Sequence, residues 1–220
     1  MASTRIRPLI AALAFLPALC AFGAPLPVKL TKQSDRVRVE IGGKLFTEYV
    51  FGDGATRPYC YPILSADGTP LTRDFPMKET PGEETDHPWH RSITFTHASV
   101  NGVDFWNEGT GGSAGKSPKA KGRSTHESFL EVRDGSVGVI ATRNRWTDPD
   151  GKLICTDERT VRFHGEGEAR FIDFEITVHA LPDQPLVFGD NKDGTMGYRM
   201  PLWMTLPHKY KNQQVPGVGH

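Results

Sequence analysis

The chain of 220 residues has no long hydrophobic run after its first two dozen positions and almost no net charge. No later segment approaches the roughly 18 apolar residues that a membrane-spanning helix needs. Lys and Arg number 26, as do Asp and Glu, so no excess positive charge favours nucleic acid or an anionic membrane as a partner. We therefore expect no nucleic-acid partner and no membrane span in the mature protein.

Cysteine is scarce as well, with three residues in the whole chain. Cys20 lies in the N-terminal apolar stretch, which leaves Cys60 and Cys155, each within a strand-like run. No CxxC or HExxH motif is present, so neither pattern suggests a metal centre. The two remaining cysteines could form a disulfide in an oxidising compartment or remain buried as small hydrophobic residues, and we favour buried free thiols.

The N-terminus has the features of an export signal. Arg5 and Arg7 precede an apolar run over 9–22, and Ala21 and Gly23 supply the small residues that a signal peptidase reads. We predict a signal peptide over residues 1–23, cleaved after Gly23, and a periplasmic or extracellular mature protein. A lipoprotein is the alternative, although Leu19 stands where a small residue is preferred before a lipidated cysteine.

Removal of residues 1–23 leaves 24 basic and 26 acidic residues, a formal charge of 24 minus 26, or −2. The remaining 197 residues (220 minus 23) suffice for one domain over 24–220 with a substantial core. The segment 207–220 reaches a Pro-Gly turn and then stops without a terminating element. We therefore expect a domain that is incomplete at its C-terminal end.

Strand signals dominate this region. Residues 36–41 alternate between polar and apolar, and Gly42-Gly43 is a two-residue turn typical of hairpins. No stretch of 12 residues keeps a helical period, and a Gly-, Ser- and Lys-rich surface loop is expected over 109–123. The predicted fold class is all-β, an antiparallel β-sandwich. The predicted strands are 36–41, 44–51, 59–64, 92–96, 103–106, 128–132, 137–146, 153–163 and 169–180.

The segment TDHPWHRSITFTH, residues 85–97, is the most concentrated chemistry in the chain. It places three imidazoles, a carboxylate, a guanidinium and an indole within thirteen positions, more than packing or solubility requires. Pro88 restricts the backbone, so we expect Asp86–His90 to be a rigid loop that leads into a half-buried strand. Loops anchored on a sheet are frequent positions for catalytic groups.

Three interpretations of His87, His90 and His97 stay open. One imidazole could transfer a proton near neutral pH while the others hold substrate hydroxyl groups. The same imidazoles with Asp86 could instead bind zinc or another divalent metal, or they could merely close a strand and cap a loop. We favour proton transfer and substrate binding, and expect no cofactor, with a divalent metal as the alternative.

Arginine and tryptophan side chains near this segment suit ligand binding. Arg57 and Arg91 could recognise a carboxylate or vicinal hydroxyls, or form ion pairs with Asp53, Asp74 or Asp86. Trp89 and Trp106 could stack on a sugar ring, although Trp106 also suits core packing.

Further candidates lie later in the chain. Glu108 could be a catalytic carboxylate or a solvated loop acid. Asp190 and Lys192 stand in FGDNKDGTMGYR (188–199), which ends on Arg199, and His126 opens a strand. His164 and His179 each end a strand and are expected to be structural.

Four phrases carry a family resemblance. Through these four sequence motifs the chain resembles secreted bacterial proteins labelled methane oxygenase PmoA, also described as a domain of unknown function. The resemblance spans nearly all of the mature chain and implies about another hundred residues in family members, so that this chain is an N-terminal fragment. The phrases are RPYCYPILSADGTPLTRDFP (57–76), TDHPWHRSITFTHASVNGVDFWNE (85–108), CTDERTVRF (155–163) and FGDNKDGTMGYR (188–199).

The family label implies a metal-dependent oxygenase. The membrane subunit of methane monooxygenase needs several transmembrane helices, however, and a histidine-brace oxygenase needs an N-terminal His where the mature chain has Ala24. By analogy alone, the organisation is similar to the sandwich of galactose mutarotases, whose open face carries His, Arg, Asp and Trp. In mutarotases the glutamate base comes late in the chain, which implies a partial site here.

Together these features predict an exported, carbohydrate-related enzyme, a hydrolase, lyase or epimerase that acts on a sugar or glycan. A non-catalytic glycan-binding protein is one alternative, and a metal-dependent oxygenase is the other. The predicted catalytic residues are Asp86, His87, His90 and Glu108. The predicted substrate-binding residues are Arg57, Trp89, Arg91, His97, His126, Asp190 and Lys192.

Overall fold

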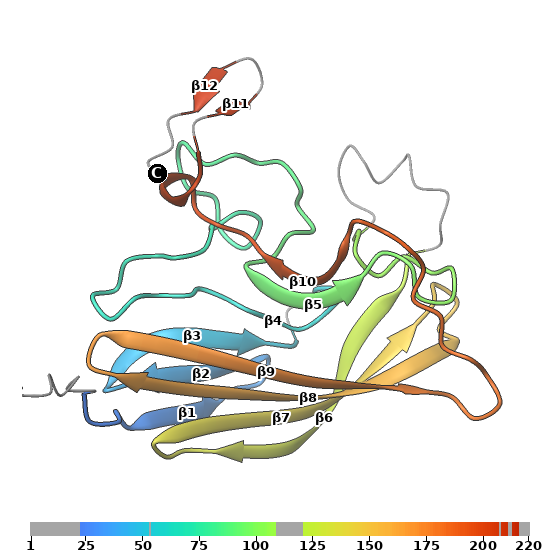
Figure 1. The fold of residues 1–220 in the computed structure, drawn as a ribbon, viewed down its shortest axis with the longest axis horizontal. Helices are drawn as coiled ribbons and strands as arrows, with labels where there is room; N and C mark the ends of the chain where they lie inside the picture. Colours follow the sequence, from blue (N-terminus) through green and yellow to red (C-terminus); the bar gives the residue numbers. More distant parts are fainter. Residues whose placement is uncertain (1–22, 53, 109–120, 207, 211–212, 216–220) are drawn as a thin grey trace, which may run out of the picture.

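Nearly all regular structure is β-strand in the computed structural model, which describes residues 23–52, 54–108, 121–206, 208–210 and 213–215. These residues contain one 3-10 helix, η1 (Leu202–Met204), and no α-helix. The strands form two antiparallel sheets that pack against each other (Figure 1). The predicted all-β, antiparallel sandwich is therefore confirmed.

The two sheets and one short hairpin contain twelve strands within the described ranges. The first sheet has the order β1 (Val28–Lys32), β2 (Arg36–Ile41), β3 (Lys44–Val50), β4 (Tyr59–Cys60), β5 (Ile93–His97) and β10 (Gly194–Tyr198). The second has the order β6 (Arg123–Arg133), β7 (Val137–Thr147), β8 (Leu153–Glu166) and β9 (Ala169–Ala180). The hairpin consists of β11 (His208–Tyr210) and β12 (Gln213–Val215).

Local sequence explains the first hairpin. The alternation in β2 turns Val37, Val39 and Ile41 inward, where each is fully buried, as the period of two along a strand requires. Gly42 and Gly43 connect β2 to β3 with φ values of 60° and 76°. Two successive positive φ values define the turn that matches the twist of a two-residue hairpin, and glycine adopts them without steric cost.

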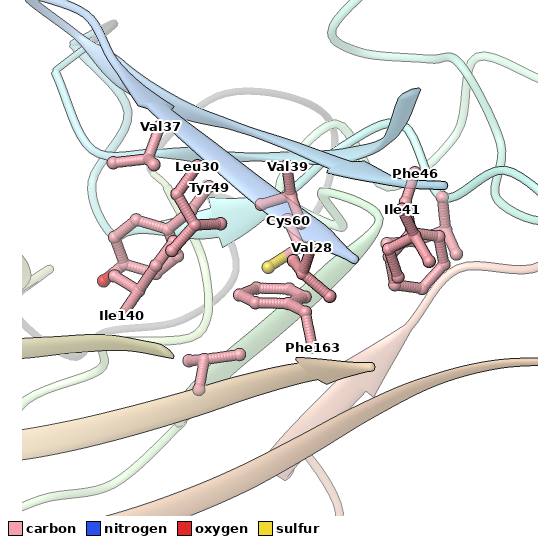
Figure 2. Packing of buried hydrophobic residues seen from close by; sticks show 12 residues of the cluster. Val28, Leu30, Val37, Val39, Ile41, Phe46, Tyr49, Cys60, Ile140 and Phe163 are labelled. Carbon is pink, nitrogen blue, oxygen red and sulfur yellow. The ribbon is translucent and has the colours of Figure 1, made fainter. Parts of the chain in front are cut away.

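The main core lies between the two sheets. Valines and an isoleucine from β1 and β2 face Ile140 of β7 and Phe163 of β8, and Phe46 packs edge-on against Phe163 with ring centroids 6.4 Å apart (Figure 2). Cys60 lies in this cluster, whereas Cys155 belongs to a second cluster around Trp146. Both cysteines are free and buried, as we expected.

Two predicted strands differ from the structure. The 59–64 run is a regular strand only at Tyr59–Cys60, since Pro62 has no amide hydrogen to continue the ladder. Residues 103–106 are not a strand, because the Asp104 carboxylate accepts the backbone N–H groups of Trp106 and Asn107 and turns the chain.

Strands β1 and β10 were not predicted. The sequence of β10, GTMGY, contains two glycines, which disfavour a strand by propensity. Its pairing with β5 overrides this preference.

Two predictions fall largely outside the described residues. They are the signal peptide, of which 1–22 are not described, and the surface loop, of which 109–120 are not described. Within the part of the chain that the structure covers, no helix has the length and apolar character needed to cross a membrane.

Candidate functional site

The histidine-rich loop enters β5 through a tight turn. The His90 N–H donates to the His87 carbonyl at 2.9 Å, and the backbone at His87 and Ser92 has φ values of 46° and 42°. Positive φ is uncommon for residues other than glycine, so His87 and Ser92 mark two tight bends in the backbone, one on each side of His90. Asp86–His90 is a loop without helix, as predicted.

Arg57 joins this loop to the segment before Glu108. Its guanidinium is 3% exposed and donates to the carbonyl oxygens of Trp89, of Phe105 at 2.9 Å and of Trp106 at 2.9 Å. Burial lowers the pKa of Arg57 to about 10, although the nearby Glu108 carboxylate favours the charged form. Arg57 therefore holds the two tryptophan-bearing segments side by side.

Arg91 and Glu108 form a forked ion pair. Arg91 Nε lies 3.0 Å from Glu108 Oε1, and Arg91 Nη2 lies 3.1 Å from Oε2. The Glu108 carboxylate also accepts the Thr56 hydroxyl at 3.1 Å and lies 3.7 Å from Arg57 Nη2. Glu108 is thus an acidic partner of both arginines, whereas Asp86 pairs with Arg73 and Arg199; Asp53, another suggested partner, lies outside the described residues.

The Asp86 carboxylate is shared by three cationic or polar side chains. Arg73 and Arg199 both donate to Oδ1, Arg199 at 2.6 Å, and His87 Nδ1 is hydrogen-bonded to Oδ2. Burial acts to raise the pKa of Asp86, but the bond from Arg73 and the charge of Arg199 outweigh it and hold the pKa far below its ordinary range. Asp86 is consequently a permanent anion.

His90 lies among aromatic rings and positive charges. Its ring is stacked on His87 with centroids 5.3 Å apart and meets Trp106 edge-on at 5.0 Å. Burial lowers the pKa of His90 to about 4, and the charges of Arg199 and Arg57 act in the same direction. The imidazole is therefore neutral at pH 7, with one nitrogen able to donate and the other able to accept a hydrogen bond.

These groups surround a cavity of about 210 Å³ at the β5–β10 side of the first sheet. Its lining includes the two tryptophans, Trp89 and Trp106, and three residues of β10 over 196–198. His90 and the three arginines Arg57, Arg91 and Arg199 supply its charged and titratable groups. Among the described residues no carboxylate is in the lining, although Asp86 and Glu108 pair with arginines that are.

Of the four predicted site histidines only His90 lines this cavity; His87 is stacked on His90 but is not in the lining, and His97 and His126 lie elsewhere. His97 accepts the Ser99 N–H on its Nδ1 and packs against Phe188 with ring centroids 5.3 Å apart. His126, on β6 of the second sheet, packs between Phe51 and Phe129. Neither ring lines the cavity.

The remaining predicted ligand groups also lie elsewhere. Asp190 and Lys192 are exposed, and Lys192 Nζ lies 3.6 Å from Asp193. The alternative metal set of His87, His90 and His97 is not brought together. Over the described ranges, no group of three His, Cys, Asp or Glu side chains could hold a metal ion.

Sequence reasoning did not select two arginines of the site, Arg73 and Arg199. They are neighbours because the Arg73 N–H donates to the Arg199 carbonyl at 3.0 Å, which brings together segments far apart in the sequence. Arg199 was visible as the last residue of FGDNKDGTMGYR, but no spacing rule connects it to Asp86. The unpredicted pairing of β10 with β5 places it there.

Comparison with known proteins gives one match. The model of a family described as a family of unknown function, DUF6807, matches residues 36–217. No curated protein and no solved structure shows significant similarity to the chain. The match covers the cavity and every residue discussed around it.

Proposed function

Since the chain belongs to the DUF6807 family, a family of unknown function, we propose a function from the site itself: an exported, carbohydrate-related enzyme that binds one sugar ring in the cavity. His90 transfers the proton in this proposal. The cavity carries the proposal, because it combines two indoles, an imidazole and three guanidinium groups in one small space. The sugar as ligand comes from the analogy with galactose mutarotases, whose open face carries the same kinds of side chain.

The size and lining of the cavity support a small polar ring. Pockets for drug-sized ligands have volumes of about 300–1,000 Å³, and this one is smaller, at about 210 Å³. Trp89 and Trp106 line the cavity but are 5% and 8% exposed, so only a small part of each apolar indole is open to a sugar. Guanidinium groups provide planar donors for hydroxyl or carboxylate oxygens.

His90 is the group best suited to proton transfer. Within the described part of the chain its ring nitrogens have no hydrogen-bond partner, so both are available to a ligand. A neutral imidazole can accept a proton from a sugar hydroxyl or ring carbon. Asp86 and Glu108 act in this proposal as positioning residues, because each is already held by arginines. His87 stacks on His90 and completes the link to Asp86.

Binding and turnover measured on the same protein test the proposal. The purified chain would be titrated with monosaccharides by calorimetry and then incubated with those that bind, with anomer exchange and bond cleavage followed by NMR. We expect His90→Gln to keep binding within a few fold and to abolish turnover. His179→Gln, at an exposed position on β9, is the matched control and should behave like the wild type.

A non-catalytic sugar-binding protein is the second candidate. It is favoured by the ion pairing of both nearby carboxylates, which leaves the cavity without the free acid that glycosidases use. Binding without any turnover, in the wild type and in His90→Gln alike, would establish this candidate and exclude the first. Export has a separate test, since the protein recovered from the cell envelope should begin at Ala24.

A further inference from the structure

The charged groups around the cavity are unbalanced. Arg57, Arg91 and Arg199 line it, and none of the acidic side chains in the described ranges does. Glu108 lies close to Arg57 and Arg91, and Asp86 contacts Arg199 from behind. Three guanidinium groups therefore face the cavity with only two carboxylates beside them.

Arg73 makes this imbalance larger. Asp86 already has one guanidinium partner in Arg73, whose side chain is 1% exposed. Arg199 adds a second guanidinium to the same oxygen, Oδ1. Among the described residues, these four guanidinium groups minus the two carboxylates that pair with them leave two positive charges in excess; Asp104, which also acts on Arg57, is itself paired with Lys121. A positively charged pocket with no acid in its lining favours an anionic ligand.

Donors remain unused in the cavity wall. Arg199 donates from Nη2 to Asp86, while its Nε and Nη1 have no hydrogen-bond partner in the described part of the chain. The Arg57 side chain is 1% exposed, and its buried Nε has no hydrogen-bond partner among the described residues. A buried donor without an acceptor is destabilising, and an acceptor on a bound ligand would remove that cost.

We propose that the ligand of this cavity is a sugar acid whose carboxylate is bound by Arg199, with its ring against Trp89 and Trp106. The inference rests on the proposed function and names the substrate class for it. A carboxylate is planar and matches the paired N–H groups of a guanidinium, which gives charge-assisted hydrogen bonds in a fixed orientation. Arg199 directly follows β10, the outer strand of the sheet, and is one of the residues that line the cavity.

Binding of a carboxylate would also change His90. The pKa of this imidazole is low because of its burial and because Arg199, His87, Arg57 and Arg73 all add positive charge around it. An anion between His90 and Arg199 would offset part of that charge and raise the pKa of His90 toward neutrality. The ligand would thereby make the imidazole a better base.

The test compares matched sugars on the full chain. Glucuronate, galacturonate and mannuronate would be titrated by calorimetry beside glucose, galactose and mannose, with the uronate methyl esters as uncharged analogues of the same shape. Glucose 6-phosphate and acetate complete the panel. We expect at least one uronate to bind about tenfold more tightly than its neutral sugar and its ester, because hydrogen bonds between charged groups are stronger than those to an uncharged oxygen.

Variants locate the effect. Arg199→Gln should remove the preference for the acid, measured as the ratio of the uronate affinity to the neutral-sugar affinity in the same variant, and Arg199→Lys should restore part of it. Arg143→Gln, an exposed arginine on β7, is the control. The wild-type titrations compare uronates with neutral sugars and so test the inference without any variant. The inference can therefore fail even if Arg199→Gln does not fold.

The outcomes separate the inference from the proposed function. Equal binding of glucose and glucuronate would overturn the inference and leave the sugar proposal standing. Tighter binding of glucose 6-phosphate than of any uronate would also overturn it, in favour of a phosphate. Acetate binding as tightly as the uronates, with no binding of neutral sugars, would contradict the sugar proposal and keep the carboxylate site. No binding of any sugar or sugar acid would overturn both.

Discussion

Two arginine–carboxylate clusters in this protein use the same chemistry in different surroundings. Inside the sandwich, Arg159 donates from Nε and Nη2 to the two oxygens of Asp157, each at 2.8 Å, and both side chains are buried. At the β5–β10 side of the first sheet, four arginines share Asp86 and Glu108 around a cavity. The interior cluster is balanced at one charge each, while the cavity cluster has an excess of positive charge.

The two clusters also differ in their hydrogen bonding. Around Asp157 the remaining acceptor capacity is used by Trp146 Nε1 and by Asn144 Nδ2 at 2.8 Å, and Arg159 also donates to Ser124 Oγ at 2.9 Å. A buried pair of this kind needs such bonds to offset desolvation. The cavity cluster keeps donors that have no hydrogen-bond partner among the described residues. Such donors destabilise the folded protein, and they are expected at a site where a ligand supplies the acceptor.

The largest expected effect comes from breaking the interior pair. Asp157→Ala leaves the Arg159 charge buried without a counterion and should lower the free energy of unfolding by about 4 kcal/mol. Urea denaturation measures it. The control Arg143→Gln removes an exposed pair with Glu158 on the same strands and should leave stability almost unchanged. Similar losses in both variants would mean that burial does not distinguish these pairs.

Removal of Arg57 should affect both stability and binding. Arg57→Met keeps the apolar stem but leaves the carbonyls of Trp89, Phe105 and Trp106 without their donor. We expect a loss of about 3 kcal/mol in the free energy of unfolding, together with loss of ligand binding because the two indoles are no longer held side by side. Thermal melting and calorimetry measure the two effects, and normal binding in a folded variant would contradict the positioning role.

His90 should make stability depend on pH over a defined window. Its pKa is about 4 in the folded protein, against an ordinary value of 6.5, because of burial and the charges of Arg199, His87, Arg57 and Arg73. The unfolded chain therefore binds more protons between these values, so this contribution to stability is present above pH 6.5 and is lost as the pH falls toward 4. Urea titrations of the wild type and His90→Gln would show it, as the variant should have a shallower slope. Equal slopes would exclude the low pKa.

The smallest expected effect concerns the thiols beside the interior cluster. Burial raises the pKa of Cys60 and of Cys155 to about 12, so neither is a thiolate at pH 8. Native protein should not react with a disulfide reagent within an hour, whereas urea-unfolded protein should react at both positions. Rapid reaction of the native form would show that water reaches this interior, and the contrast with the cavity would then be weaker.

Sequence patterns predicted much of the fold and only part of the site. The alternation in Arg36–Ile41 and Ala169–Ala180 marks strands with the observed bounds, because side chains in a strand face alternately inward and outward. The concentration of chemistry at Asp86–Arg91 likewise pointed to residues that surround the cavity. It could not show that His97, on the strand that follows this segment, lies outside the cavity.

What the sequence determined by itself is therefore local: the β class, the Gly42-Gly43 turn, and the position of the histidine loop before a strand. Long-range pairing was decided only by the tertiary structure. Arg199 reaches Asp86 across 113 positions and Arg57 reaches Trp106 across 49. Such contacts depend on which strands become neighbours, and β10 joins β5 despite its two glycines. The physical reason is that the alternation of polar and apolar residues along a strand determines which face of the sheet a side chain lies on. The residues that it contacts depend on how the whole sheet is buried against its neighbours.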